Sequence, residues 1–246
     1  MKKVVFFSVL CSLLLASCVK INLGNGSKIE PIGKIVKHEY RLASFNQVDV
    51  DVVANVKLIQ SKSGDSRVVL SCPENYVELF KFDVNQGKSQ LDISFTRDNA
   101  NIEAQNVDIT VYTPALRKLE SSGVASVEID KLNATELSVD NSGVGSMYLY
   151  GLSVGKLVVD CSGVGNIELK GVADKVELDC SGVGSIKAED LKAKEVKAEV
   201  SGVGGIRCYA SERIDGEVSG VGSLKFGGNP QKKQLERNGI GDISEL

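Results

Sequence analysis

The sequence predicts an all-β fold, a single-stranded parallel β-helix in which a solenoid winds with about 20 residues per coil. The first observation behind this prediction is a tetrapeptide, Ser-Gly-Val-Gly, that recurs at a nearly fixed interval. The second is the alternation of apolar and polar residues on both sides of each copy, which is typical of strands. We expect seven stacked coils with a right-handed winding and an irregular β cap at the N-terminal end.

The tetrapeptide defines the repeat. Steps between its copies are 20, 20, 19, 20, 18 and 19 residues, which is the range of solenoid repeats. Repeats this short cannot bury an apolar face alone, so they must stack on one another. The first copy is a variant, Ser-Gly-Val-Ala, and the last reads Asn-Gly-Ile-Gly. The copies begin at Ser122, Ser142, Ser162, Ser181, Ser201, Ser219 and Asn238.

The N-terminus has the composition of a secretion signal. Lys2 and Lys3 precede an apolar run, Val4 to Leu15, that is too short to span a membrane. The following Leu-Ala-Ser-Cys, which ends at Cys18, resembles the lipobox of bacterial lipoproteins. That resemblance implies a signal peptide over residues 1–17, cleavage before Cys18 and attachment of lipid to Cys18. An ordinary signal peptide with an incidental cysteine is the alternative.

Residues 18–34 are rich in glycine, asparagine and serine, and predict a tether between lipid and folded domain. A lipid on Cys18 implies a place in the bacterial cell envelope, with the outer membrane as the expected location and its periplasmic or outer face left open. No later stretch is apolar enough to span a bilayer, so the lipid is the only membrane attachment that we expect.

The charge of the mature chain bears on its partners. Loss of Lys2 and Lys3 with the signal leaves 27 basic residues against 32 acidic ones, a net charge of −5. Phosphate binding needs a concentrated basic surface, which a mildly acidic chain does not supply. We therefore expect no nucleic acid among the partners.

Residues 35–115 keep the alternation but lack the glycine corners. We expect an N-terminal β region that is continuous with the solenoid and caps its end against edge-on aggregation. The turn residues Asn85–Lys88 lie between two alternating runs and predict a hairpin. Glu74–Phe80 fits either one short helical turn or an irregular loop.

Residues 116–246 hold the repeats and a C-terminal cap. In the coil around the third corner, Leu157, Val159 and Cys161 take every second position before the corner and Ile167 and Leu169 do so after it, with polar residues in most of the gaps. Period-two alternation turns one face in and one face out. Each coil is therefore expected to consist of two short strands, with a return corner near Gly171.

The corners themselves allow specific expectations. Glycine reaches positive φ at little steric cost, and the valine between two glycines is expected to point inward as a plug. Each serine is expected to hydrogen-bond its own corner, although the row of serines could instead present hydroxyls to a sugar polymer. In the C-terminal cap, Pro230 and the polar segment Gln231–Gln234 are expected to interrupt the period before a last coil.

Four cysteines remain once Cys11 is removed and Cys18 is lipidated. Cys161 and Cys180 occupy the same position of successive coils, and a stacking distance of about 4.8 Å lies within the Cα separations that a disulfide allows. They could instead be small buried residues in a stack, because lateral neighbours in a ladder point the same way. No Cys-x-x-Cys spacing supports a zinc or haem site.

Further motifs carry a resemblance to a known family. An opening strand, Phe45–Val50, precedes a hinge, Tyr112–Leu116, and serial Ser-Gly-x-Gly coils follow, with Gly-Asn-Ile at 165–167. Together with the lipobox, these motifs resemble the putative auto-transporter adhesin, head GIN domain family, over about residues 35–246. The resemblance implies a β-helical fold and an envelope location, and it transfers no catalytic residues.

An acidic residue lies two positions before each serine of the repeat. The alternation turns these side chains outward, and stacking places like charges about 4.8 Å apart, where they repel by about 1 kcal/mol in water. The column is therefore a candidate site for Ca²⁺ or another hard cation, or for a basic partner surface. A solvated face with Lys118, Lys187 and Lys197 nearby is the alternative. The column consists of Glu120, Asp140, Asp160, Asp179, Glu199 and Glu217.

These features predict a lipid-anchored, non-catalytic envelope protein that binds a protein or polysaccharide through stacked β-helix faces, as an adhesin does. A carbohydrate-active β-helix, either a polysaccharide lyase or a hydrolase, is the alternative, and a structural envelope component is a third reading. The single histidine, His38, has no nucleophile or metal-ligand spacing around it. A catalytic site would require a departure from the uniform columns. The departures in this sequence are limited to Arg207 beside Tyr209 and to the pair Tyr148 and Tyr150. We expect no cofactor apart from Ca²⁺ on the acidic column.

Overall fold

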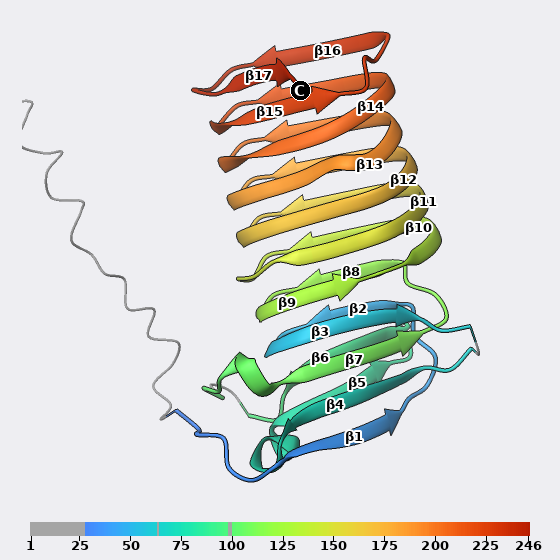
Figure 1. Ribbon diagram of the computed structural model, residues 1–246, viewed down its shortest axis with the longest axis vertical. Helices are drawn as coiled ribbons and strands as arrows, with labels where there is room; N and C mark the ends of the chain where they lie inside the picture. Colours follow the sequence, from blue (N-terminus) through green and yellow to red (C-terminus); the bar gives the residue numbers. More distant parts are fainter. Residues whose placement is uncertain (1–27, 63, 98–99) are drawn as a thin grey trace, which may run out of the picture.

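The structure, a computed structural model, describes residues 28–62, 64–97 and 100–246. They form one stack of β coils that winds from the blue N-terminal end to the red C-terminal end (Figure 1). The coils are parallel and in register, with about 6 turns of roughly 20 residues each. The predicted parallel β-helix is confirmed, but the solenoid has about 6 turns where seven coils were expected. The predicted signal peptide, residues 1–17, and Cys18 lie outside the described residues.

An antiparallel cap closes the N-terminal end of the stack. Strand β1 pairs with β4, β4 pairs with β7, and β5 and β6 form the hairpin predicted from the turn residues. Between β4 and β5 the chain forms a 3-10 helix, η1, so the helical-turn alternative holds there. The bounds are Ile35–Arg41 (β1), Arg67–Pro73 (β4), Glu74–Leu79 (η1), Phe80–Asn85 (β5), Gln90–Phe95 (β6), Ala104–Asn106 (η2) and Asp108–Thr113 (β7).

The end of the predicted tether is bound to this cap. The Tyr76 hydroxyl donates a hydrogen bond to the carbonyl of Ile29 at 2.6 Å, and the backbone N–H of Ile32 donates to Asn75 Oδ1 at 2.8 Å. Residues 28–34 therefore enter the fold at the cap end of the solenoid, beside η1.

Two short strands join the cap to the regular coils. Strand β2 pairs in parallel with β6 on one side and with β8 on the other. Strand β3 does the same with β7 and β9. Parallel register therefore begins before the first glycine corner. The bounds are Gln47–Val50 (β2), Val53–Gln60 (β3), Lys118–Ser121 (β8) and Val124–Ile129 (β9).

From β11 to β14 each coil is one long strand, which bends around the return corner on the right of Figure 1 and breaks at the Ser-Gly corner. The register shifts at the return corner, between Leu149 and Leu152 and between Glu168 and Lys170. The bounds are Leu132–Asn141 (β10), Met147–Cys161 (β11), Val164–Cys180 (β12), Val183–Val200 (β13), Val203–Val218 (β14) and Val221–Gly227 (β15).

The C-terminal segment continues the stack, and the predicted interruption at Gln231–Gln234 is wrong. Lys232–Arg237 forms strand β16, which lies in parallel register on β14, and Asp242–Glu245 forms β17 on β15. Every residue of β16 is exposed because no further coil covers it. The polar sequence therefore reflects the open end of the stack, not a break in its period.

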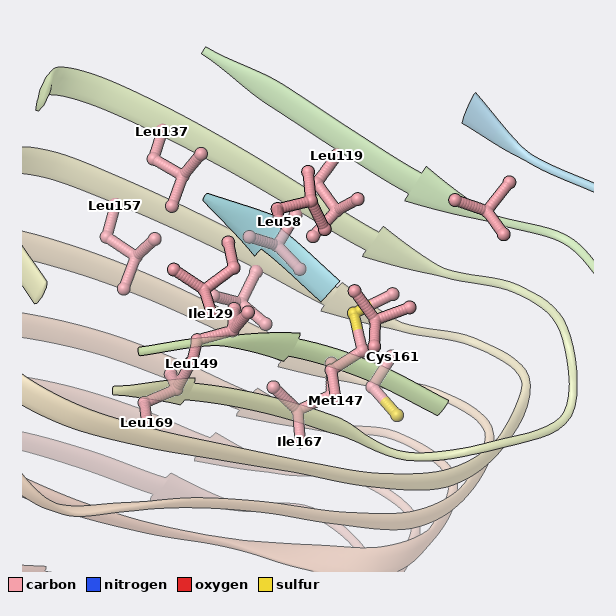
Figure 2. Packing of buried hydrophobic residues seen from close by; sticks show 14 of the residues in the cluster. Leu58, Leu119, Ile129, Leu137, Met147, Leu149, Leu157, Cys161, Ile167 and Leu169 are labelled. Carbon is pink, nitrogen blue, oxygen red and sulfur yellow. The ribbon is translucent and has the colours of Figure 1, made fainter. Parts of the chain in front are cut away.

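Apolar side chains fill the interior in columns. Figure 2 shows Leu137 and Leu157 on neighbouring coils, and Leu149 and Leu169 in another column. Each of these four side chains is at most 1% exposed. Burying a leucine contributes about 1.5–3 kcal/mol, so each coil is stabilised mainly by the coils above and below it.

Close approach between coils explains the corner glycines. A Cβ on Gly184 or Gly204 would lie 1.7 Å from the carbonyl oxygen of the glycine one coil earlier. Positive φ is found in the corners at Gly145 and Gly165, with values of 146° and 157°. Backbone packing, more than turn conformation, therefore excludes side chains at these positions.

The corner valines point outward, so the prediction of an inward plug is wrong. Strand alternation continues through the corner and places serine, valine and the residue after the second glycine on the outside. The serines are exposed, and among the described residues none of the six hydroxyls forms a hydrogen bond, contrary to expectation. We call the row of outward valines the valine ridge. Its members are 46% to 57% exposed: Val144, Val164, Val183, Val203 and Val221.

Candidate binding surface

The six acidic residues predicted as a column do lie in one column. Each is the in-register partner of the next, because Glu120 on β8 faces Asp140 on β10 and the series continues strand by strand. All six side chains are partly exposed. The register follows from the nearly constant repeat length, which returns the same position to the same face in every coil.

The column is longer than the sequence indicated. In the strand register, Asp49 is the partner of both Glu120 and Asp92. Asp92 is in turn the partner of Asp83, and Glu236 is the partner of Glu217. A usable signal was present, since Asp49 alternates with Val48 and Val50, but no glycine corner marks that strand. We call the whole column the carboxylate ladder. In spatial order it contains Asp83, Asp92, Asp49, Glu120, Asp140, Asp160, Asp179, Glu199, Glu217 and Glu236.

Three carboxylates of the ladder have a raised pKa. Partial burial raises the pKa of Asp49, Asp140 and Asp179, and neighbouring carboxylates in the ladder raise it further. Like charges about 4.8 Å apart repel by about 1 kcal/mol in water, and by more where the side chains are partly desolvated. A positive group that reached the ladder would therefore relieve repulsion as well as gain attraction.

Lysines neutralise the ladder only in part. Lys118 Nζ lies 2.7 Å from Glu120 Oε1, and Lys197 Nζ lies 2.6 Å from Glu199 Oε1. Each of these lysines lies two residues before its acid. Two residues before the central acids Asp140, Asp160 and Asp179 the chain has Ser138, Val158 and Glu177, none of which is basic. The other lysine expected nearby, Lys187, is the register partner of Glu168 across the corner, so it does not serve the ladder.

The centre of the ladder is consequently unpaired. Within the described residues, no lysine or arginine forms an ion pair with Asp140, Asp160 or Asp179. The Oδ1 atoms of Asp160 and Asp179 are buried and have no hydrogen-bond partner. An unsatisfied buried carboxylate oxygen is unfavourable, so the negative charge is least well compensated in this stretch of the ladder.

The ladder is a row and not a cage. In the described part of the chain, no three histidine, cysteine, aspartate or glutamate side chains converge as a resident metal ion requires. Ca²⁺ prefers six to eight oxygen ligands, whereas a ladder offers one carboxylate per rung. The geometry therefore suits an extended partner with several positive groups better than a single bound ion.

The four cysteines among the described residues, Cys72, Cys161, Cys180 and Cys208, are all buried. Cys161 and Cys180 are adjacent in register, buried and unbonded, so the stacked-residue alternative holds. Burial raises the pKa of Cys72 to about 11 and that of Cys208 to about 12. Such thiols stay protonated near neutral pH, and the thiolate is the nucleophilic form.

A second group of charged residues lines a small hollow of about 210 Å³. Lys170 Nζ lies 2.8 Å from Glu168 Oε1, and Arg207 Nε lies 3.0 Å from Glu189 Oε1. The hydrogen bond from Lys170 lowers the pKa of Glu168. The other oxygen of Glu189, Oε2, is buried without a partner. This hollow, which Lys187 also lines, brings acids and lysines together on one face.

The tyrosines and the histidine singled out in the sequence lie apart from the carboxylate ladder. The rings of Tyr148 and Tyr150 lie 6.3 Å apart, and Lys192 Nζ lies 3.9 Å from the centre of the Tyr209 ring. His38 is exposed on the outermost strand β1. None of these side chains belongs to the carboxylate ladder.

Parallel coils that stack in register and repeat one outward residue along each column define a β-solenoid protein with long, periodic surfaces. The chain belongs to the family described as putative auto-transporter adhesin, head GIN domain, whose family model matches residues 44–230. No curated protein matches the chain. No helix in the described residues is long and apolar enough to cross a membrane.

Solved structures agree with this assignment. A putative adhesin from Bacteroides fragilis NCTC 9343 is 33% identical, with a TM-score of 0.85 over 90% of this chain and 100% of that one. Two proteins from Parabacteroides distasonis ATCC 8503 share the fold. A putative lipid binding protein is 19% identical with a TM-score of 0.73, and a putative adhesin is 21% identical with a TM-score of 0.72. Each of these two covers 89% of this chain and 100% of its own.

Family membership supports a binding role without catalysis, and a location in the cell envelope or at the cell surface. The geometry agrees with such a role, because the outward columns repeat one chemical group along the stack.

Proposed function

We propose that the protein is a lipid-anchored, non-catalytic binding module of the bacterial cell envelope that holds its ligand on the carboxylate ladder. The observation that carries the proposal is the unpaired centre of the ladder, Asp140, Asp160 and Asp179, with two buried oxygens that lack partners. Family membership supports the binding role.

The ligand that fits this surface is extended and carries repeated positive groups. A lysine-rich or arginine-rich protein segment has them, and so does a polysaccharide with free amino groups. Each exposed ion pair contributes only about 0.2–1 kcal/mol, so useful affinity requires several contacts at once. Repetition along one rigid stack supplies them, because the first contact raises the local concentration for the next.

Calorimetric titration with polylysine and with Ca²⁺ tests the proposal. Polylysine is expected to bind, and Asp160→Asn with Asp179→Asn should weaken it by about tenfold, the loss of two ion pairs. A matched control, Asp174→Asn with Asp190→Asn, removes the same charge away from the ladder and should leave binding unchanged. If neither titrant binds, or if both variants lose affinity equally, the ladder is not the binding site.

The anchor rests on the N-terminal sequence, where a basic start and an apolar run precede Cys18. The described chain begins at the capped end of the stack, so a tether on Cys18 would leave the coils extending away from the membrane. Cys18→Ala should move the protein from the membrane fraction to the soluble fraction, and mass spectrometry of the N-terminal peptide should lose the lipid. An unmodified Cys18 in the native protein would end the anchoring proposal.

A carbohydrate-active site is the second candidate, and the hollow beside Glu189 is the observation that favours it. An acid and a base on one strand face could cleave a uronic-acid polymer. Incubation with polygalacturonate, followed by absorbance of unsaturated products and by reducing-end assays, decides the matter. If product forms and Glu189→Gln abolishes its formation, the protein is an enzyme. If no product forms, the binding module is the remaining candidate function.

A further inference from the structure

The valine ridge is a continuous apolar row on the outside of the solenoid. Its members are register partners from coil to coil, from Val144 through to Val221. Ile240, which is 84% exposed, takes the same position in the last corner. At about 4.8 Å per coil, the row from Val144 to Ile240 is about 24 Å long. Scattered exposed valines need no explanation, but a contiguous row of them indicates an interaction site.

The strip around the ridge is uncharged. In the first six corners, the five residues from serine onward are only serine, glycine, valine, alanine or asparagine, and Asp242 in the last corner is the first charge. The carboxylate ladder begins only two residues before each serine, so this neutrality is local. Two copies of the strip can meet without like-charge repulsion, whereas a charged partner gains nothing there.

The ridge is also unobstructed and strictly periodic. Both chain neighbours of Val164, Val183, Val203 and Val221 are glycines, so no adjacent side chain along the strand shields their methyl groups. A partner with the same rise per coil can place an apolar group against every rung. A second copy of this chain has that rise, and a two-fold axis makes the contact mutual.

The size of the strip fits such a contact. Seven corners with three outward residues each supply about 21 residues, near the lower end of the roughly 20–30 per side that stable interfaces use. From these observations we infer that the ridge is the interface of a homodimer, in which two solenoids lie side by side, ridge against ridge. This interface is separate from the ladder that carries the proposed function.

Sedimentation analysis of residues 28–246, which contain the whole described core, tests the inference. The unmutated protein is expected to dimerise in a concentration-dependent manner, and Val164→Lys with Val183→Lys should abolish the dimer. Val172→Lys is the matched control, since Val172 is 52% exposed but lies away from the ridge. Unchanged circular dichroism spectra would establish that the lysine variants remain folded.

Cross-linking locates the contact. Val183 lies on the ridge itself, in the central corner of the seven, so Val183→Cys should form a disulfide-linked dimer under mild oxidation whether the ridges run parallel or antiparallel. The four native cysteines of the described chain are buried and should not interfere. Ser153→Cys, exposed at the return corner, should not cross-link.

Three outcomes would overturn the inference. They are a monomeric unmutated protein at all concentrations, a dimer that survives both lysines, and a monomer whose ridge valines instead drive binding to phosphatidylethanolamine vesicles. Each outcome is distinguishable from failure of the proposal that the carboxylate ladder binds the ligand. Polylysine binding is measured on the same variants and should persist in all of them.

Discussion

At the scale of single residues, the spacing between coils decides which side chains the corners accept. The backbone of each coil approaches the previous one so closely that a Cβ on a corner glycine would overlap a carbonyl oxygen. One residue further along the strand, a valine projects into solvent without restriction. Within one corner, therefore, the glycines cannot be replaced by residues with a side chain, whereas the valine position accepts one.

Replacing Gly184 by alanine tests this intolerance. The new Cβ would lie 1.7 Å from the carbonyl oxygen of Gly165, so the coils must separate locally. We expect the free energy of unfolding to fall by roughly 3 kcal/mol. Urea unfolding followed by circular dichroism measures it. Gly87→Ala is the control, because its Cβ would meet only a side-chain oxygen at 3.4 Å and should change stability by less than about 0.5 kcal/mol.

Asp179 tests the ladder's repulsion. Burial, and then the charges of its ladder neighbours, raise its pKa, so the folded protein binds this proton more tightly than the unfolded chain does. The folded state therefore gains stability as pH falls from neutral toward the ordinary aspartate pKa of about 3.9, and loses it as pH rises through the raised pKa. Asp179→Asn should flatten this dependence and stabilise the protein at neutral pH by roughly 1 kcal/mol.

Thermal melts across this pH range give the measurement. Asp174→Asn is a control outside the ladder, because Asp174 pairs with Lys194 at 2.7 Å on an exposed surface. Its effect should stay within about 0.5 kcal/mol at every pH. A lower stability of Asp179→Asn at neutral pH would contradict the account of the ladder as a repulsive column.

At the scale of the element, the coil is the unit of both sequence and structure. Each coil contacts its neighbours through parallel register, and its core residues repeat from one coil to the next. In such a stack, stability is approximately a sum of coil and interface contributions. Whole coils should therefore be removable, whereas fractions of a coil should not.

Deletion of residues 162–180 tests this modularity. Ser181 would then follow Cys161, so the corner and the alternation stay intact. We expect a folded, shorter solenoid with the same circular dichroism per residue and a lower urea midpoint. Deletion of residues 162–170 removes half a coil and should unfold the protein, because apolar positions then face the wrong side. Equal behaviour of the two deletions would show that the coil is not the folding unit.

The repeat made the coils and the six acids from Glu120 to Glu217 predictable, and the turn residues Asn85–Lys88 made the hairpin predictable. The outward direction of the valines was missed because apolar character was weighed above alternation, which runs unbroken through the glycines. Asp49 and Asp92 were missed because the cap brings them into the column through pairings of distant strands. The strand at Lys232 was missed because an open end of the stack needs no apolar face.

At the scale of the whole molecule, two periodic surfaces and two protected ends organise the solenoid. The ladder and the valine ridge flank the serines of each corner, so one coil contributes to both. Antiparallel strands close the N-terminal end, and charged residues along the exposed strand β16 oppose end-to-end pairing at the other. The lateral surfaces are therefore the ones left for partners.

The central claim is that the ladder binds as one continuous row of ten carboxylates. Its length is about 43 Å at about 4.8 Å per rung, which an extended oligolysine of about 13 residues would span. The most direct measurement is the affinity of oligolysines of increasing length. The account predicts that affinity rises steeply up to about that length and then levels off, and that Asp160→Asn with Asp179→Asn reduces the rise. An affinity that does not depend on oligolysine length would contradict the account. So would an equal rise in affinity for the unmutated protein and for this variant.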